Sequence, residues 1–344
     1  MSYNEDIKAV ASQTLPWEKL NGCNILVTGA TGLIGSCIIE VLMEHPDMNY
    51  HVYASGRDEK RAMARFAKYA GNSSFHFFHY DVTERLTGDT NFHYIIHAAS
   101  YASPNYFATK PVEVIKANIE GVANLMDYGL AHDLRRFLYI SSGEVYGEGD
   151  GSIFTEDYSG YVDCTTLRSC YPASKRAAES LCIAYAHQFG PDVVIARLSH
   201  VFGPYFTNND NRVYAQFIRN VLRGEDIVMK SSGDQFRSWC YIADCISGIL
   251  HILLKGDNTN AYNIADNNSN ISIKELANLI AEIGNRKVIM EIPSDTEKKG
   301  YNIVTKSVFS TEKLESLGWN PSTEGIKSNL KKTIEELKRR NFIG

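Results

Sequence analysis

This chain of 344 residues lacks several features that would place it in a specialised class of protein. No apolar run approaches the roughly 20 residues that a membrane-spanning helix needs, and the best candidate, Ile246 to Leu254, contains Ser247 and His251. Positive charge is not in excess, because the formal net charge is −5. We therefore expect neither a membrane nor a nucleic-acid partner.

Cysteine and histidine also lack the spacings of a metal or disulfide site. The seven cysteines form no C-x-x-C pair, and the ten histidines show no paired ligand spacing, so no metal is expected. Cys164 and Cys170 lie near the catalytic candidates described below, but neither has an evident His partner, and we interpret both as bystanders. The opening residues lack the basic and apolar segments of a secretory signal, which predicts a cytoplasmic location.

The order of apolar and periodic segments predicts an α/β fold with a doubly wound parallel sheet of the Rossmann type. Hydrophobic residues make up 44% of the chain and charged residues 22%, as in an ordinary globular protein, and the length suggests about two domains. The predicted strands cover residues 25–28, 51–55, 75–80, 94–97, 137–141 and 193–198. The predicted helices cover residues 33–44, a stretch ending at 70, residues 112–132 and a stretch from 171.

A glycine-rich turn follows the first of these strands. It reads GATGLIG from Gly29 to Gly35, between the apolar run Ile25 to Val27 and a segment of helical period. Glycines at such a junction let a dinucleotide pyrophosphate approach backbone N–H groups at a helix N-terminus. Strand, turn and helix come in the order that this site requires, which favours a dinucleotide-binding turn over an ordinary tight turn.

Tyr171 and Lys175 lie four residues apart in the run YPASK, just past a strand-like segment that ends at Ser142. Residues one helical turn apart share a face, so both side chains can act on one substrate and one cofactor. A lone Y-x-x-x-K is usually a solvated helical pair. Downstream of a glycine turn, however, it indicates redox chemistry at a sugar or alcohol carbon.

Six motifs in this order resemble those of the extended short-chain dehydrogenase/reductase family, specifically its NAD(P)-dependent nucleotide-sugar epimerases, dehydratases and decarboxylases. The resemblance runs from about Asn21 to about Trp319 and is closest to the UDP-glucuronate decarboxylases. The motifs are the glycine turn, HAAS at His97 to Ser100, SSGEVYG at Ser141 to Gly147, YPASK, FGP at Phe202 to Pro204, and Arg237 seven residues before Asp244.

The resemblance implies the domain organisation. The expected units are an N-terminal extension at 1–20, a dinucleotide-binding domain at 21–198 with a return segment at 240–265, and a sugar-nucleotide-binding domain at 199–239 and 266–344. Leu15, Trp17 and Leu20 of the extension are expected to pack on the first domain. Beyond Leu198 the pattern is irregular. Helices are predicted at 213–223, 272–283 and 323–339, and polar loops at 205–212 and 266–270.

The resemblance also assigns the contacts with cofactor and substrate. The predicted NAD(P) contacts are Gly29, Thr31, Gly32, Leu33, Ile34, Gly35, Arg57, Asp81, Val82, Ala98, Ala99, Tyr171 and Lys175. The predicted substrate contacts are Ser100, His200, Arg212 and Arg237. Relatives pair the helices at 112–132 and 171–189 into a four-helix bundle, which, with apolar residues on more than one face of each, predicts a homodimer.

Catalysis would begin with oxidation of an alcohol. Free Tyr has a pKa near 10 and is a poor base at neutral pH, so the phenolate of Tyr171 needs stabilisation, which Lys175 and the positive nicotinamide would supply. Ser142 is expected to hydrogen-bond the same substrate oxygen. Ser141 is the alternative if the SSGEVYG segment aligns with the family motif one residue differently.

Gly143 and Glu144 bear on the step after oxidation. In 4,6-dehydratases the motif resembles TDEVYG, in which the Asp protonates the departing 6-hydroxyl and the Glu removes the C5 proton. Gly143 stands at the Asp position, whereas decarboxylases keep the Glu and need no dehydration acid. This difference favours a decarboxylase, although Glu144 could instead be a structural carboxylate that caps N–H groups.

Two arginines and one histidine bear on the substrate. Arg237 matches the arginine that binds the sugar-nucleotide diphosphate and, in decarboxylases, helps recognise the uronate, and bidentate recognition of an anion needs its fork. Arg212 resembles the Arg of the NDGRV sequence that decarboxylases use around the nucleotide, with Asn211 in place of the Gly. His200 replaces the Asn of R-x-x-N-x-x-G-P. Two interpretations therefore stay open: His200 is a core histidine, or the enzyme acts on a different sugar.

The leading hypothesis is oxidation of the sugar at C4 followed by decarboxylation of a UDP-uronate. The alternatives are a 4-epimerase or 4-keto reductase, then a 4,6-dehydratase. A non-enzymatic NAD(P) sensor is disfavoured because Tyr171 and Lys175 are both present. The second predicted strand ends without the usual acid for an adenosine ribose, and Arg57 or Arg61 could accept a 2′-phosphate, which favours NADP over NAD. Asp58 is close enough to bond the ribose hydroxyl, so both NAD and NADP stay open.

Overall fold

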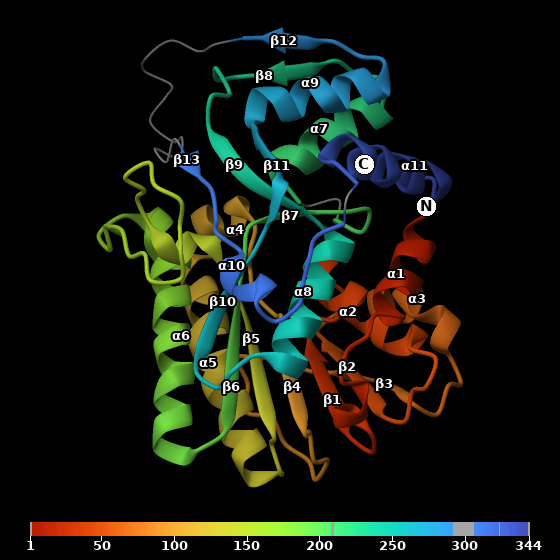
Figure 1. Ribbon diagram of the computed structural model, residues 1–344, viewed down its shortest axis with the longest axis vertical. Coiled ribbons are helices and arrows are strands. Elements are labelled where there is room, and N and C mark those ends of the chain that lie inside the picture. Colours follow the sequence, from red (N-terminus) through yellow and green to blue (C-terminus); the bar gives the residue numbers. More distant parts are fainter. Residues whose placement is uncertain (1, 208–209, 292–305, 323, 343–344) are drawn as a thin grey trace.

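The computed structural model describes residues 2–207, 210–291, 306–322 and 324–342. Asn209, in a predicted polar loop, and Thr323, the predicted start of the last helix, lie outside the described residues. Within them, the predicted α/β fold class is confirmed, and two sheets lie one above the other in Figure 1.

Among the described residues, seven parallel strands form the larger sheet. They are β1 (Asn24–Thr28), β2 (His51–Gly56), β3 (Phe75–His79), β4 (Tyr94–His97), β5 (Arg136–Ser142), β6 (Asp192–Leu198) and β10 (Asn260–Ile264). Their order is β10-β6-β5-β4-β1-β2-β3, so the winding reverses between β1 and β4. In such sheets ligands bind outside the carboxyl ends of the strands at this reversal.

Both faces of the larger sheet are covered by helices, whose bounds are α2 (Leu33–Glu44), α3 (Glu59–Arg65), α4 (Pro104–Thr109), α5 (Pro111–Ala131), α6 (Cys170–Phe189) and α8 (Ile242–Lys255). Successive side chains of β1 point to opposite faces. Ile25 and Val27 join a core with α2 and α8, while Leu26 joins a second core with α5 and α6. This double burial explains why the strand reads as an unbroken apolar run.

A smaller sheet is formed by β7 (His200–Phe202), β9 (Phe236–Tyr241), β11 (Asp266–Ser272) and β13 (Lys306–Ser307), and a separate pair by β8 (Ile227–Met229) and β12 (Val288–Met290). The predicted polar loop at 266–270 is wrong, because these residues open β11, antiparallel to β9. Its sequence DNNSNIS carries no apolar alternation. Pairing with β9, rather than local preference, makes it a strand.

The remaining helices are α1 (Tyr3–Ala11), α7 (Val213–Leu222), α9 (Ile273–Gly284), α10 (Glu312–Glu315) and α11 (Ile326–Arg339). The predicted helix ending at 70 is shorter than expected, since α3 stops at Arg65 and a 3-10 turn, Ala67–Tyr69, follows. Helix α4 was not predicted. No helix within the described ranges is long and apolar enough to span a bilayer.

The N-terminal segment packs against the larger domain and against the last helix, α11. Leu15 and Leu20 are buried in the same core as α2 and α8, as expected. Helix α1 also contacts α11, and these two helices lie on the same side of the molecule in Figure 1. Asp6 accepts hydrogen bonds from Tyr241 (3.0 Å) and from Lys332 (3.0 Å), so polar contacts add to the apolar packing.

Candidate active site

The glycine turn brings β1, β4 and α2 closer together than any side chain would allow. Gly29 has φ of +65°, and a Cβ there would lie 2.7 Å from the Ala98 carbonyl oxygen. A Cβ on Gly35 would lie 2.9 Å from the carbonyl carbon of Gly29. The N–H groups of the first turn of α2, which includes Leu33 and Ile34, have no acceptor within the helix. The turn therefore offers a site for a pyrophosphate.

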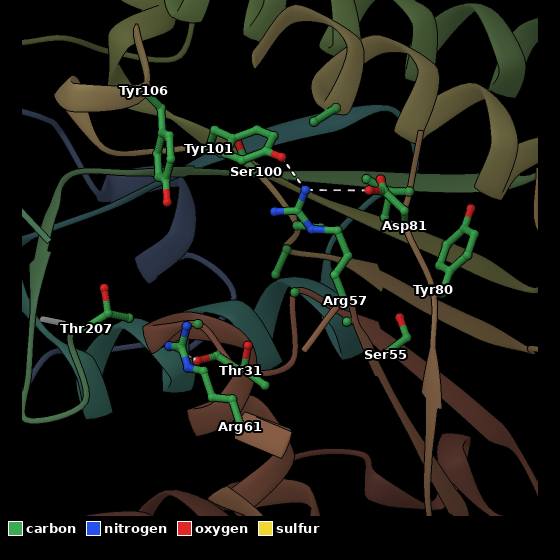
Figure 2. Close-up of a pocket in the computed structure, with 17 residues that line it drawn as sticks. Thr31, Ser55, Arg57, Arg61, Tyr80, Asp81, Ser100, Tyr101, Tyr106 and Thr207 are labelled. Atoms are coloured by element: carbon green, nitrogen blue, oxygen red, sulfur yellow. Dashed lines mark hydrogen bonds and ion pairs between the residues drawn. The ribbon is translucent and has the colours of Figure 1, made fainter. Parts of the chain in front are cut away.

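A cavity of about 270 Å³ opens at this turn, and Figure 2 shows the side chains that line it. The predicted residues that line it are Gly29, Thr31, Gly32, Arg57, Asp81, Val82, Ala98, Ala99 and Ser100. Lining residues that the sequence did not single out include Ser55, Tyr80, Tyr101, Tyr106 and Thr207. The buried Ser55 hydroxyl has no partner among the described residues, which fits a cavity built for a polar ligand.

Ser100, predicted to contact the substrate, lines the same cavity as the predicted cofactor residues. Its hydroxyl donates to Asn118 Oδ1 (2.9 Å), and Asn118 in turn donates to Ser174 on α6 (2.9 Å). This chain of hydrogen bonds links the wall of the cavity to the helix that carries Tyr171 and Lys175.

Ser142, Tyr171 and Lys175 converge at the carboxyl end of β5 and the start of α6. The Ser142 hydroxyl is close enough to Tyr171 to act on the phenol as a hydrogen-bond partner. Ser141 points the other way and donates to the buried Glu179 (2.5 Å). The structure therefore places Ser142, and not Ser141, at the phenol.

Burial sets the charge states of Tyr171 and Lys175. It raises the pKa of Tyr171 to about 12; the Glu144 carboxylate adds to the rise, and Ser142 acts in the opposite direction. Burial also lowers the pKa of Lys175 to about 7, against the pull of Glu179. The Lys175 amine donates to the Ile140 carbonyl oxygen (2.8 Å). The Tyr171 phenol therefore keeps its proton at neutral pH until further positive charge favours the phenolate.

Glu144 is held by an arginine. Its Oε1 accepts a hydrogen bond from Arg168 Nη2 at 2.6 Å, so the carboxylate is paired with a guanidinium. The Glu144 charge also acts on Arg237 and on Tyr171. Arg168, to which no role was assigned from the sequence, is therefore part of the site.

Gly143 faces an aromatic ring from the C-terminal part of the chain. A Cβ at Gly143 would lie 2.9 Å from Phe309 Cε1 and closer still to Cζ. Phe309 is 2% exposed and packs in a small core with Val145, Tyr146 and Phe154. The position at which dehydratases carry their acid is thus closed to any side chain here.

We expect Gly143→Ala to destabilise the protein by about 1–3 kcal/mol, because its methyl group would overlap a packed ring. Urea unfolding would measure the loss. Gly325→Ala is the control for a methyl group added without overlap, since a Cβ there meets nothing within 4 Å, and its loss should be the smaller of the two and limited to the cost of Ala at the N-cap of α11. The double variant Gly143→Ala/Phe309→Ala should lose less than the sum of the two single losses; strict additivity would contradict the overlap.

Three predicted substrate residues lie close to Tyr171 and Glu144: Arg212, Arg237 and His200. Arg212 forms a bidentate pair with Asp210 (2.5 Å for Nη2 to Oδ2), and its charge acts on Tyr171. The imidazole of His200 lies against Trp239, with ring centroids 5.2 Å apart, and is exposed. Although the residue is exposed, protein atoms crowd one side of the ring, and this desolvation, followed by the charges of Arg237 and Arg212, lowers the pKa of His200. A neutral imidazole is a poor acid for dehydration.

Glu179, one turn after Lys175 on α6, is a further residue that the sequence did not single out. Its carboxylate is buried and pairs with Arg197 (2.7 Å). The Y-x-x-x-K-x-x-x-E spacing was the available signal, because it places Glu179 on the same face. Burial raises the pKa of Cys170, which is the opposite of what a nucleophilic cysteine needs. No cluster of three metal-ligating side chains exists within the described ranges.

Comparison with known proteins identifies the family. The sequence model of the NAD dependent epimerase/dehydratase family matches residues 25–265. The chain belongs to this family. UDP-glucuronic acid decarboxylase 5 of Arabidopsis thaliana is 34% identical over 308 residues, which cover 87% of this chain and 85% of the relative. UDP-glucuronic acid decarboxylase 1 of Danio rerio is 32% identical, over 92% of this chain and 72% of the relative.

Solved structures of similar fold include UDP-glucose 4-epimerase of Thermotoga maritima, with a TM-score of 0.79 at 24% identity over 92% of this chain and 99% of that chain. Another is UDP-glucuronic acid 4-epimerase of Bacillus cereus, with a TM-score of 0.76 at 22% identity over 92% of this chain and 99% of that chain. At such identities the likeness supports the fold. The predicted membership in the extended short-chain dehydrogenase/reductase family is confirmed.

Proposed function

We propose that this protein oxidises a UDP-uronate at C4 with bound NAD(P)+ and then decarboxylates it. One observation carries the choice of reaction: the Phe309 ring fills the place of the dehydration acid at Gly143, while Glu144 and its arginine partner stay beside Tyr171. The relatives above, named as UDP-glucuronic acid decarboxylases, support the proposal.

The cofactor would lie along the cavity of Figure 2, with its pyrophosphate at the turn from Gly29 to Gly35. When bound, NAD(P)+ supplies a hydride acceptor for C4 and positive charge near the phenol. That charge favours the phenolate of Tyr171, which takes the proton of the C4 hydroxyl. Ser142 hydrogen-bonds the same oxygen and holds it in line with the phenol.

The 4-keto sugar is a β-keto acid, and this explains the next step. The C5–C6 bond breaks, CO2 leaves, and the electron pair of the bond moves onto the C4 oxygen as an enolate. Tyr171, now protonated, and Ser142 donate hydrogen bonds to that oxygen. Protonation at C5 would give a 4-keto pentose, whose C4 would take back the hydride while Tyr171 returns the proton to the C4 oxygen, which gives the pentose nucleotide and leaves the cofactor oxidised again. Arg237 and Arg212 place two positive charges where the substrate carries a diphosphate and a carboxylate.

Two substrates, UDP-glucuronate and a UDP-hexose, test the reaction, with mass spectrometry to detect a change of mass and chromatography to separate epimers. We expect UDP-glucuronate to give a pentose nucleotide with release of CO2. Conversion of a UDP-hexose to a 4-keto-6-deoxy product would overturn the argument from Gly143. Conversion of a hexose to its C4 epimer alone, without a change of mass, would support a 4-epimerase, which needs only Ser142, Tyr171 and Lys175.

Arg237→Ala is expected to weaken UDP-glucuronate binding roughly tenfold to a hundredfold, since a charge-assisted hydrogen bond contributes about 1.5–3 kcal/mol. The inhibition constant of UDP-glucuronate, or its Kd by calorimetry, would measure the change. Arg286→Ala, an exposed arginine after α9, is the control. An unchanged Kd in the Arg237 variant would remove this residue from the substrate site.

We also propose that the protein is a homodimer. Helices α5 and α6 pack against each other and still expose apolar side chains at their ends, including Val112 (60% exposed) and Phe189 (55% exposed). A second copy of the same helix pair would cover these surfaces. A monomer by light scattering at micromolar concentration would contradict the proposal.

A further inference from the structure

Arg168 belongs to the site, but the mechanism above gives it no task. It lies in a 3-10 turn, Leu167–Ser169, that leads directly into α6 and therefore into Tyr171. Its partner Glu144 lies in another 3-10 turn, Gly143–Tyr146, that follows β5. The ion pair, at 2.6 Å, thus joins the turn that carries Glu144 to the start of the helix that carries the phenol.

An aromatic ring fixes the other contact of Arg168. The guanidinium carbon lies 4.7 Å from the centre of the Phe107 ring, and this ring stacks on Tyr171 with an angle of 22° between the planes. Phe107, on α4, is buried at 3% exposure, so it offers a rigid surface. A planar guanidinium can lie on such a ring and still donate to a carboxylate, which the compact ammonium of Lys does less well.

Stability alone does not explain the ion pair. The Arg168 side chain is 45% exposed and the Glu144 side chain 36%, and exposed pairs of this kind contribute little to the free energy of unfolding. Both charges nevertheless act on Tyr171, whose side chain is buried. The pair is therefore placed to influence the phenol more than the fold.

Several elements contribute the charged and titratable groups around the phenol. They are Glu144, Arg168, Cys170, Lys175, Arg212 and Tyr139, with Tyr101 and Tyr106 packed on the same cluster. Burial raises the pKa of Tyr171 most, and the Glu144 charge adds to the rise. Arg212 and Arg168 oppose it, but Arg212 is already paired with Asp210. Arg237 also lies within the field of Glu144.

We propose that Arg168 is a positioning residue that holds Glu144 in place beside Tyr171 and offsets its negative charge, so that Tyr171 can release its proton during oxidation at C4. This inference rests on the proposed function and adds a residue to its site. Glu144 can then stay close to the substrate without opposing the phenolate. Arg168 itself needs no contact with the substrate.

A double-mutant cycle tests the positioning, with single-turnover reduction of the bound cofactor by UDP-glucuronate as the readout. Arg168→Met should lower the rate about tenfold or more, and in a Glu144→Gln background the same change should cost less than about threefold, because no carboxylate is left to hold. Arg168→Lys should restore part of the rate. The exposed Arg85→Met is the control. Equal losses in both backgrounds would overturn the positioning.

The pH dependence of the same rate tests the offset of charge. Removal of a cation disfavours the phenolate, so in Arg168→Met the rate should rise with pH at a midpoint about half a unit or more above that of the unmodified protein. Arg168→Lys should keep the midpoint close to its original value. A merely structural role would lower the rate and leave the midpoint in place, and that result would overturn the offset.

Release of CO2, followed in the same samples, separates this inference from the proposed function. Reduction of the cofactor without CO2 would overturn the decarboxylation, and the Arg168 comparison would still decide the role of the arginine in oxidation. If the unmodified protein neither reduces its cofactor nor releases CO2 with UDP-glucuronate, the proposed function and the role of Arg168 both fall.

Discussion

Replacing Tyr171 with Phe is expected to lower turnover by at least about a hundredfold while NAD(P) binding persists, the lower range for loss of a positioned acid or base. The variant removes the hydroxyl that exchanges the C4 proton and keeps the ring, which stacks on Phe107 with centroids 4.6 Å apart. Single-turnover reduction of the bound cofactor at 340 nm would measure the lost step.

Tyr185→Phe is the matched control for this variant. It lies on the same helix, α6, and its hydroxyl donates to Asp127 (2.6 Å), away from the cavity. Turnover of the control should stay close to that of the unmodified protein. Near-normal turnover in the Tyr171 variant would remove Tyr171 from the chemistry altogether.

Lys175→Met is expected to have opposite effects on turnover and on stability. Turnover should fall by about a hundredfold or more, because the amine beside the phenol is lost. The free energy of unfolding should rise at neutral pH, because burial lowers the pKa of Lys175 from 10.5 to about 7, and an amine so depressed destabilises the fold by several kcal/mol. Glu179 keeps its ion pair with Arg197, so no buried carboxylate is stranded.

The gain in stability should depend on pH in a defined direction. Between about pH 7 and pH 10.5 the unfolded chain binds the Lys175 proton more tightly than the folded protein does, so the stability of the unmodified protein rises with pH across this window. The advantage of Lys175→Met should therefore be largest near or below pH 7 and vanish toward pH 10.5. Urea unfolding at several pH values would measure it, with the exposed Lys116→Met as control.

A stability gain that does not shrink with pH would show that packing, not the buried charge, explains the effect. A loss of stability at neutral pH would show that the hydrogen bond from the Lys175 amine to Ile140 outweighs the cost of burial. Either result leaves the turnover measurement as a separate test of the role of Lys175 in catalysis.

The larger sheet was predictable from the sequence because each of its central strands is buried on both faces. Such strands appear in the sequence as apolar runs like Ile25 to Val27. The ends of the predicted strands agree with the observed ends to within about one residue. The smaller sheet leaves no such run. β11 is polar at each of its first five positions, and only its pairing with β9 makes it a strand.

The sequence by itself determined the chemistry that requires neighbouring residues: the glycine turn, whose backbone must pass close to β4, and the Tyr171 and Lys175 pair one helical turn apart. Tertiary structure decided what depends on distant residues. Phe309 closes the space at Gly143 and Arg168 holds Glu144, both contacts that no local periodicity encodes. Local spacing specifies which groups share a face, whereas packing specifies which of them remain open to a ligand.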